Sequence, residues 1–167
     1  MNTEMEARTK LWSLIKDIRF AMFTTRSADG ELHSRPMTTQ NRQVDEDDRL
    51  WFFMSRRGHP VENLVEAAGV NVSYSDPDSD RYVSVSGIAR VVDERSKKEA
   101  FWSALVEAWF PGGIDDPDLA LVEVKITQAE FWDVKASKLT QLYKMAKAAV
   151  TGKPPVDLGE THTVRMQ

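Results

Sequence analysis

The stretch Leu50-Trp51-Phe52-Phe53-Met54-Ser55-Arg56-Arg57-Gly58-His59-Pro60 decides the fold. Its first five residues are all apolar, which is the pattern of a β-strand covered on both faces. Two arginines follow this strand, and Pro60 favours the first turn of a helix. We therefore predict a buried strand that ends in a cationic turn, with one face against the protein core and the other against a partner.

The residues before this strand predict a helix and then a hairpin. Thr3 and Glu6 have capping-box spacing, and apolar residues recur at helical intervals to an expected end near Asp17. Strands are predicted over residues 19–26 and 32–41, joined by an Asp-Gly turn that supplies the positive φ of a tight hairpin. Because Pro36 cannot donate to a sheet ladder, the second strand should have an edge, a bulge or a ligand-facing gap there.

The residues after it predict further strands and helices that alternate along the chain. We expect helices over 60–68, 95–109 and 139–152, and strands over 70–75, 82–92, 121–126 and 130–134, of which 82–92 is the longest. Within that strand Gly87 leaves room for a close approach. Six or seven short strands with inserted helices predict an α+β barrel. We expect one domain over residues 1–152 and a polar, mobile tail over 153–167.

Composition excludes several classes of site. The 167 residues contain no cysteine, which removes disulfides and thiol chemistry and fits a cytoplasmic protein. No apolar run is long enough to span a membrane, and the polar N-terminus does not resemble a secretory signal. A net charge of −4 argues against binding to nucleic acid or anionic membranes. The histidines lack partners at a metal-like spacing, so we predict no metal site.

Three short segments could carry chemistry: Ser34-Arg35-Pro36-Met37, Ser55-Arg56-Arg57 and Glu130-Phe131-Trp132. Adjacent arginines between a strand and a helix make a good phosphate receptor, because guanidinium groups and backbone N–H groups point the same way. The competing interpretation is a solvated pair of arginines in a loop, which composition alone favours equally. Taken singly, Trp132 is more typical of a core residue and Arg35 of an exposed strand residue.

The order and spacing of these segments resemble the split barrels of the pyridoxamine 5′-phosphate oxidase-like superfamily, which bind flavin mononucleotide (FMN). The stretch Trp109-Phe110-Pro111-Gly112-Gly113, with the acidic segment 115–121 after it, looks most like the general stress protein branch. The resemblance spans roughly residues 6–143. It implies an antiparallel split β-barrel of six to seven strands with flanking helices, assembled as a homodimer.

The resemblance also assigns cofactor contacts, although it leaves the catalytic residues unknown. It implies that one strand lays its backbone along the flavin ring, through Arg35, Pro36, Met37 and Thr38. It implies that the next strand and its exit bind the ring edge and the phosphate, through Phe53, Met54, Ser55, Arg56 and Arg57. Tyr82 matches a polar position near the flavin. Trp132 matches a tryptophan that the partner subunit contributes.

The leading hypothesis is a stress protein that binds FMN, with FAD as an alternative flavin, and acts as an oxidoreductase on an unknown substrate. A second hypothesis is a protein that binds or senses flavin without turnover, and a third is a true pyridoxamine 5′-phosphate oxidase. The third is disfavoured because residues 133–139, Asp-Val-Lys-Ala-Ser-Lys-Leu, lack the Arg-x-His pattern that follows Glu-Phe-Trp in the oxidases. Distant relatives of the barrel hold deazaflavin or haem, and the fold alone does not choose among these cofactors.

Overall fold

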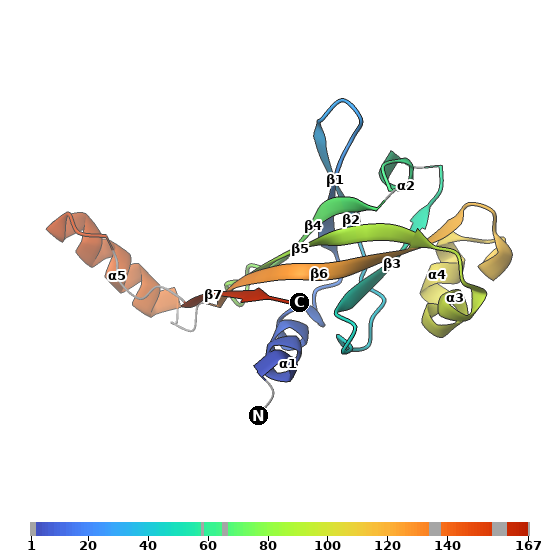
Figure 1. Ribbon diagram of the computed structural model, residues 1–167. Helices are drawn as coiled ribbons and strands as arrows, with labels where there is room; N and C mark the ends of the chain where they lie inside the picture. The colour runs from blue at the N-terminus through green and yellow to red at the C-terminus, as the bar shows by residue number, and fades with distance from the viewer. Residues whose placement is uncertain (1–2, 58, 65–66, 134–137, 155–159, 167) are drawn as a thin grey trace.

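The computed structural model describes residues 3–57, 59–64, 67–133, 138–154 and 160–166. It contains a seven-stranded antiparallel sheet in the order β2-β1-β4-β5-β6-β3, with β7 also paired to β6. The predicted α+β class and strand number are therefore confirmed (Figure 1). The strands are β1 Ala21–Arg26, β2 Leu32–Met37, β3 Arg49–Ser55, β4 Ala68–Asp76, β5 Arg81–Val92, β6 Leu119–Asp133 and β7 Glu160–Arg165.

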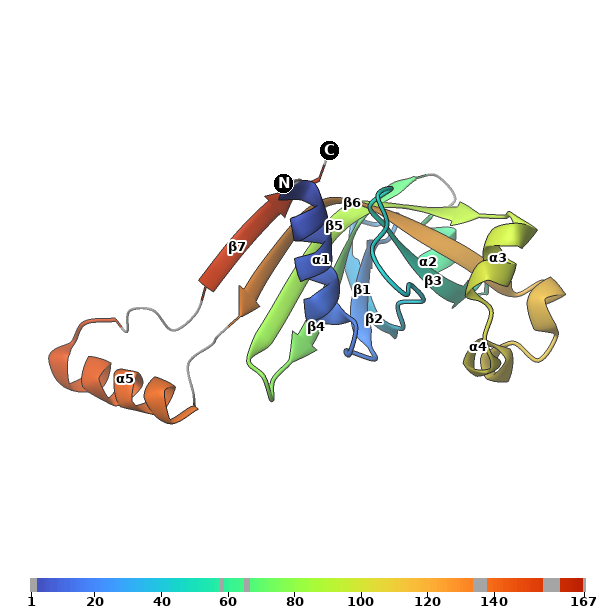
Figure 2. The ribbon, with the colours of Figure 1, turned by 90° about the horizontal axis from the view of Figure 1, so that it is seen from below.

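The helices lie around this sheet in separate places. They are α1 Thr3–Ile15, α2 His59–Glu62, α3 Arg95–Phe101, α4 Ala104–Trp109 and α5 Lys138–Thr151, and a 3-10 turn spans Gly113–Asp115. In Figures 1 and 2, α3 and α4 lie at one end of the sheet and α5 stands away from the other end. Among the described residues, no helix is long and apolar enough to cross a membrane.

The core lies between α1 and the inner face of the coiled sheet. Leu11, Leu14 and Ile15 of α1 are buried in it, at the helical spacing that the sequence predicts. Phe23 of β1 and Phe52 of β3 meet there edge to face, with ring centroids 5.2 Å apart. Strands from opposite halves of the sheet order therefore contribute to one cluster, as the coiling of the sheet into an open barrel requires.

The outer face of β3 is covered by the chain itself and not by a partner. Trp51 and Phe53 are buried in a second cluster, apart from the core that holds Phe52. Phe101 at the end of α3 stacks on Trp51, with centroids 5.2 Å apart, and Trp102 meets Phe53 edge to face. Our expectation that a second subunit must cover this face is therefore wrong, because the α3–α4 segment supplies the missing apolar surface.

The helix predicted over 95–109 is two helices. Trp102 has extended backbone, with ψ 138°, and Ser103 caps α4 by accepting a hydrogen bond from the Val106 N–H. The interruption lets two consecutive aromatic residues, Phe101 and Trp102, both face β3. A continuous helix would turn them about 100° apart.

Two of the predicted strands are parts of one strand. The structure joins residues 121–126 and 130–134 into β6, which is the longest strand at 15 residues, in place of β5. The register against β5 shifts between Ser86 and Gly87, so Thr127 has no partner in the ladder. The expected close approach at Gly87 is confirmed, since a Cβ there would clash with the carbonyl oxygen of Lys125. The break expected between the two strands is thus a β-bulge within one strand.

Three other boundaries differ from the prediction. The helix at 60–68 is shorter, because Ala68 and Gly69 pair with β5 and begin β4. The strand at 32–41 ends at Met37, and β2 is an edge strand as Pro36 predicts. Within the expected mobile tail, residues 160–165 form β7, where alternating Thr161 and Thr163 have the β-branched character of a strand.

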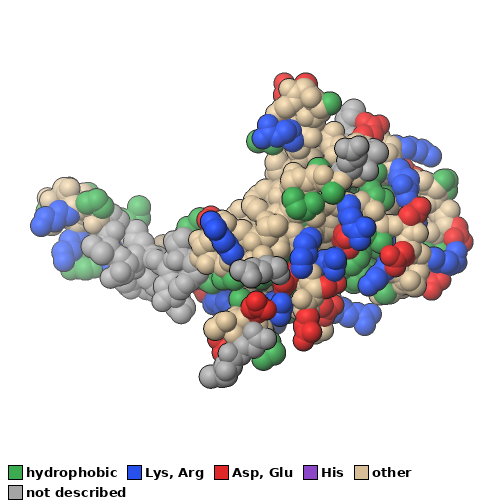
Figure 3. Space-filling model, in the orientation of Figure 1, with side chains coloured by type: hydrophobic (Ala, Val, Ile, Leu, Met, Phe, Trp, Pro, Cys, Tyr) green, Lys and Arg blue, Asp and Glu red, His purple; other side chains and the backbone are tan. Residues whose placement is uncertain are grey.

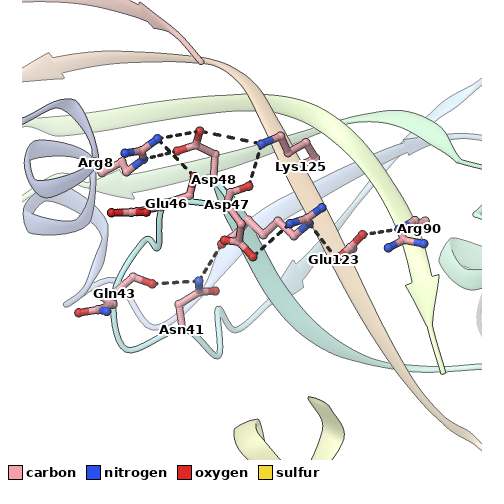
Figure 4. Close-up of polar contacts among 10 residues, drawn as sticks. Arg8, Asn41, Gln43, Glu46, Asp47, Asp48, Arg90, Glu123 and Lys125 are labelled. Atoms are coloured by element: carbon pink, nitrogen blue, oxygen red, sulfur yellow. Dashed lines mark hydrogen bonds and ion pairs between the residues drawn. The ribbon is translucent and has the colours of Figure 1, made fainter. Parts of the chain in front are cut away.

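Charged groups fix the loop that follows β2, as Figure 4 shows. Asp48, with φ 53°, is 2% exposed and accepts hydrogen bonds from the Arg8 guanidinium of α1, the shorter at 2.6 Å. Glu123 of β6 is also buried and pairs with Arg49 and Arg90. The acidic run 45–48 is therefore not simply a solvated turn, because its last residue is buried and paired. These pairs tie the loop to α1 and to β6.

Candidate functional site

The predicted cofactor residues begin at an open seam between β2 and β3. These strands occupy the two ends of the sheet order and do not pair with each other. The chain just after β2 reaches β3 where the Gln40 N–H donates to the Trp51 carbonyl oxygen at 2.8 Å. The Asn41 side chain secures the same point through the Trp51 N–H and the Arg49 carbonyl. Beyond it both strand edges are open.

Arg35 lies at this seam and has an unsatisfied polar atom. It pairs with Phe23 across β1, so its side chain lies on the inner face of the sheet. Its Nη1 atom is buried and has no hydrogen-bond partner among the described residues. A buried guanidinium nitrogen without a partner is costly. The position therefore has the chemistry to receive an acceptor or an anion.

The other predicted residues of β2 are placed differently. Pro36 pairs with Met22 on the exposed face, whereas Met37 packs partly against the core. Thr38 is exposed just beyond the strand. The adjacent Thr39 is held by a 2.5 Å hydrogen bond to the Tyr74 hydroxyl, and burial raises the pKa of that tyrosine well above its ordinary value. This hydrogen bond fixes the position of the chain where it leaves β2.

The side chains of Phe53 and Met54 do not face the seam. Phe53 lies under Trp102 in the outer cluster, and Met54 is 2% exposed in the inner core. Their backbones pair with β6 on one side only. At these two positions, what β3 can offer a ligand is the backbone of its open edge.

The turn after β3 is organised by Asp118, a residue that sequence reasoning did not select. Its carboxylate accepts hydrogen bonds from the Ser55 hydroxyl at 2.7 Å and from the Arg57 N–H at 3.0 Å. The hydrogen bond from Ser55 is the main reason why the pKa of Asp118 lies below its ordinary value. The register of β3 against β6, which brings Ser55 beside Leu119, creates this contact. A local sequence pattern could not reveal this contact, because 63 residues separate Ser55 from Asp118.

The two arginines of this turn differ in how many of their N–H donors already have an acceptor. Arg56 donates to the Leu119 carbonyl at 3.1 Å and to Asp93 at 3.3 Å. Arg57 has a side chain that is 84% exposed, and its ion pair with Asp118 is long, at 3.7 Å. Since an exposed ion pair of this kind is weak, Arg57 can turn to an incoming anion at little cost. Arg56 is in part a structural residue.

Tyr82 and Trp132 lie next to each other, far from Arg56 and Arg57. They are directly opposite each other on β5 and β6, on the outer face, with exposures of 39% and 37%. Trp132 lies thirteen residues further along β6 than Leu119, the contact of Arg56, which is about 43 Å of strand at about 3.3 Å per residue. Within one chain, the predicted flavin contacts therefore lie at two opposite ends of the sheet.

A hollow in the surface lies elsewhere and contains none of the predicted residues. It measures about 670 Å³ and lies beside the first hairpin and α2, where Arg26, Asn63 and Gly69 are among its lining residues. It is an open groove rather than an enclosed cavity. We give the seam and the arginine turn more weight, because they carry the unsatisfied guanidinium nitrogen and the exposed cation.

Comparison with known proteins identifies the family of this fold. The family model described as pyridoxamine 5′-phosphate oxidase like matches residues 6–156. A putative general stress protein 26 from Jannaschia sp. CCS1 is similar in structure, with a TM-score of 0.72 and 25% identity, over 97% of this chain and 99% of that one. The general stress FMN/FAD binding protein from Xanthomonas citri has a TM-score of 0.67 and 30% identity, over 80% of this chain and 92% of that one.

The split barrel and the match over residues 6–156 define the class: the chain belongs to the pyridoxamine 5′-phosphate oxidase-like family. Within that family it resembles the general stress protein 26 branch. General stress protein 26 of Bacillus subtilis is 30% identical over 101 residues, which are 58% of this chain and 67% of that protein. The resemblance to this branch that the sequence indicates is thus confirmed.

Proposed function

We propose that this chain is a cytoplasmic, FMN-binding oxidoreductase of the general stress protein type. The observation that carries the proposal is the buried Nη1 atom of Arg35 at the open seam, which has no partner among the described residues. A flavin has carbonyl oxygens and, in FMN, a phosphate, so it offers the acceptors that this donor requires. The similarity to a Xanthomonas citri protein described as FMN/FAD binding supports the same conclusion.

The residues around the seam fit the parts of FMN. The open edges of β2 and β3, from Arg35 to Thr38 and from Phe53 to Ser55, provide backbone groups for a flat ring. Arg57, with Arg56 beside it, provides the cationic end that a phosphate requires. When bound, the isoalloxazine ring supplies the redox chemistry, while the protein sets its orientation and its access to substrate.

We expect the purified protein to bind one FMN per chain, with flavin absorption bands and no Soret band. Arg35→Ala should weaken FMN binding about tenfold to a hundredfold, because a charge-assisted hydrogen bond is worth about 1.5–3 kcal/mol. Flavin fluorescence titration measures this, and Arg26→Ala in the first hairpin is the matched control. A haem spectrum, or a folded protein that does not bind FMN, would contradict the proposal.

We also propose a two-fold homodimer in which Trp132 of one subunit reaches the flavin held by the other. The support is the distance along β6, because a strand length of about 43 Å separates Trp132 from the arginine turn of its own chain. A two-fold axis that reverses the second subunit end for end brings the two ends together, twice per dimer. The homodimer is therefore proposed from the position of Trp132 and not from β3, whose outer face is already covered.

Mixed dimers test this arrangement. Trp132→Ala should cost about 1–3 kcal/mol of FMN affinity, the range for an aromatic ring stacked on a base. Dimers that combine one Trp132→Ala subunit with one Arg56→Ala/Arg57→Ala subunit should regain one normal site of two, because both defects fall in the same site. Failure to regain any site, or a monomer in sedimentation at micromolar concentration that binds FMN fully, would contradict the proposal.

A further inference from the structure

Helix α5 has an apolar stripe with no cover. Leu142, Met145 and Val150 recur at helical spacing, and they are 65%, 58% and 88% exposed. The helix has 14 residues and stands away from the sheet in both views (Figures 1 and 2). A hydrogen bond from Gln141 to Asp80 links the helix to the body of the protein. Because an isolated helix of this length is marginal in water, its stability requires a packing surface.

A second uncovered apolar surface lies at the opposite end of the molecule. On α4, Leu105 is 72% exposed and Trp109 is 81% exposed, although Val106 of the same helix is buried against the sheet. A large aromatic residue beside a leucine, both exposed, is typical of a contact surface. The chain therefore presents one such surface at each end.

The segments that carry the two surfaces differ in charge. Residues 138–151 contain three lysines and no acidic residue, whereas residues 104–118 contain four acidic residues and no basic one. Of these four, Asp115 and Asp118 already pair with Arg95 and Arg57, and Glu107 is the acidic residue of α4 itself. In Figure 3 the protruding helix shows basic and apolar side chains together. Charges of opposite sign around two apolar patches favour their association and set its orientation.

The relative positions of the helices make a second copy of the chain the fitting occupant. Figure 2 shows α4 and α5 at opposite ends, both on the side away from the N-terminus. A two-fold axis that reverses the second copy end for end places α5 of each subunit against α4 of the other. The same reversal brings Trp132, six residues before α5, toward the arginine turn of the partner.

We propose that α5 is an arm that docks on α4 of the partner subunit, with Leu142 and Met145 against Leu105 and Trp109. The proposal rests on the proposed two-fold dimer and adds to it a specific contact outside the flavin site. Each dimer contains two such contacts, which together close the ends of the interface.

Cysteine cross-linking tests the docking, and the chain has no native cysteine to interfere. We expect Met145→Cys protein mixed with Trp109→Cys protein, after exchange of subunits, to give a covalent dimer with a short bismaleimide. The two cysteines are on different chains, so an internal cross-link cannot form. Leu32→Cys, which replaces another exposed apolar residue at 63% exposure, is the matched control and should not cross-link to Met145→Cys.

A charge exchange gives an independent readout. Lys147→Glu should reduce the yield of cross-linked dimer several-fold, and Glu107→Lys in the partner should restore it. Sedimentation and FMN titration of the same samples separate the two proposals. A dimer that binds FMN but gives no more cross-link than the Leu32→Cys control would overturn the docking of α5 and leave the proposed function intact. A monomer would overturn both the docking and the dimer.

Discussion

Replacing Arg56 and Arg57 together by alanine is expected to weaken FMN binding by about 3–6 kcal/mol, from two charge-assisted contacts of about 1.5–3 kcal/mol each. Riboflavin, which lacks the phosphate, should lose far less affinity. The difference between the two ligands is the measured quantity, and isothermal titration or flavin fluorescence gives it directly.

The structure divides this expected loss unevenly. Arg57 is exposed and its ion pair with Asp118 is long, so its guanidinium can move from Asp118 to a phosphate at little cost. Arg56 already donates to the Leu119 carbonyl and to Asp93. It must give up the contact with Asp93 to bind phosphate with both edges of its fork. We therefore expect Arg57→Ala alone to produce more than half of the loss for FMN.

The controls separate a binding effect from a folding effect. Arg56→Lys keeps the charge but not the planar fork, so it should bind FMN with an intermediate affinity. Arg26→Ala should leave the affinity unchanged. Thermal unfolding identifies any variant in which loss of the Arg56 contact to β6 has disturbed the fold. Equal losses of FMN and riboflavin in a folded double variant would show that the arginines do not bind the phosphate.

Local patterns predicted those parts of the fold whose signals are local. The apolar run of β3, the Asp-Gly hairpin and the apolar stripe of α1 depend on neighbouring residues, and all three are present. The break between α3 and α4 depends on the fit of Phe101 and Trp102 against β3, which lies about 50 residues earlier in the sequence. A helical pattern continues through such a break, so periodicity alone could not reveal it.

The candidate site likewise combines features that the local sequence predicts with features that depend on the packed fold. Arginine at the end of a strand is a local signal, and this signal is the reason why the sequence predicts Arg56 and Arg57 as phosphate contacts. Whether such a guanidinium is occupied depends on residues brought there by the sheet register. Asp118 and Asp93 reach the turn because β6 pairs with β3 and β5 ends beside it. The unsatisfied Nη1 atom of Arg35 is likewise a property of the packed barrel.

The proposed dimer does not depend on the burial of β3. A strand apolar on both faces needs two covers, but α3 and α4 provide the second one from within the chain. The present reason is the separation of Trp132 from the arginine turn, which two ends of different chains can close. Its test by mixed dimers does not depend on how β3 is covered.

We expect the FMN-loaded protein not to oxidise pyridoxamine 5′-phosphate efficiently. In the true oxidases an Arg-x-His pattern follows Glu-Phe-Trp and holds the substrate phosphate against the flavin. Here residues 133–139 read Asp-Val-Lys-Ala-Ser-Lys-Leu, without arginine or histidine. Residues 134–137 lie outside the part of the chain that the structure describes, so this expectation depends on the sequence.

The physical reason is the difference between the two cations. A lysine attracts phosphate as a point charge, whereas a guanidinium holds two oxygens in a fixed geometry. Without that fork the substrate would be poorly oriented toward the ring, and orientation contributes much of the rate of such reactions. The competing interpretation is that Lys135 or Lys138 replaces the clamp.

Incubation of the FMN-loaded protein with pyridoxamine 5′-phosphate and oxygen separates the two interpretations. We expect pyridoxal phosphate and peroxide to form far more slowly than about 1 per second, the lower end of ordinary enzyme rates. As a control, Lys135→Arg should raise the rate if the missing fork is the limitation, and Lys138→Ala should leave it unchanged. Turnover at or above about 1 per second by the unaltered chain would mean that a lysine suffices, and that the protein is an oxidase of pyridoxamine 5′-phosphate.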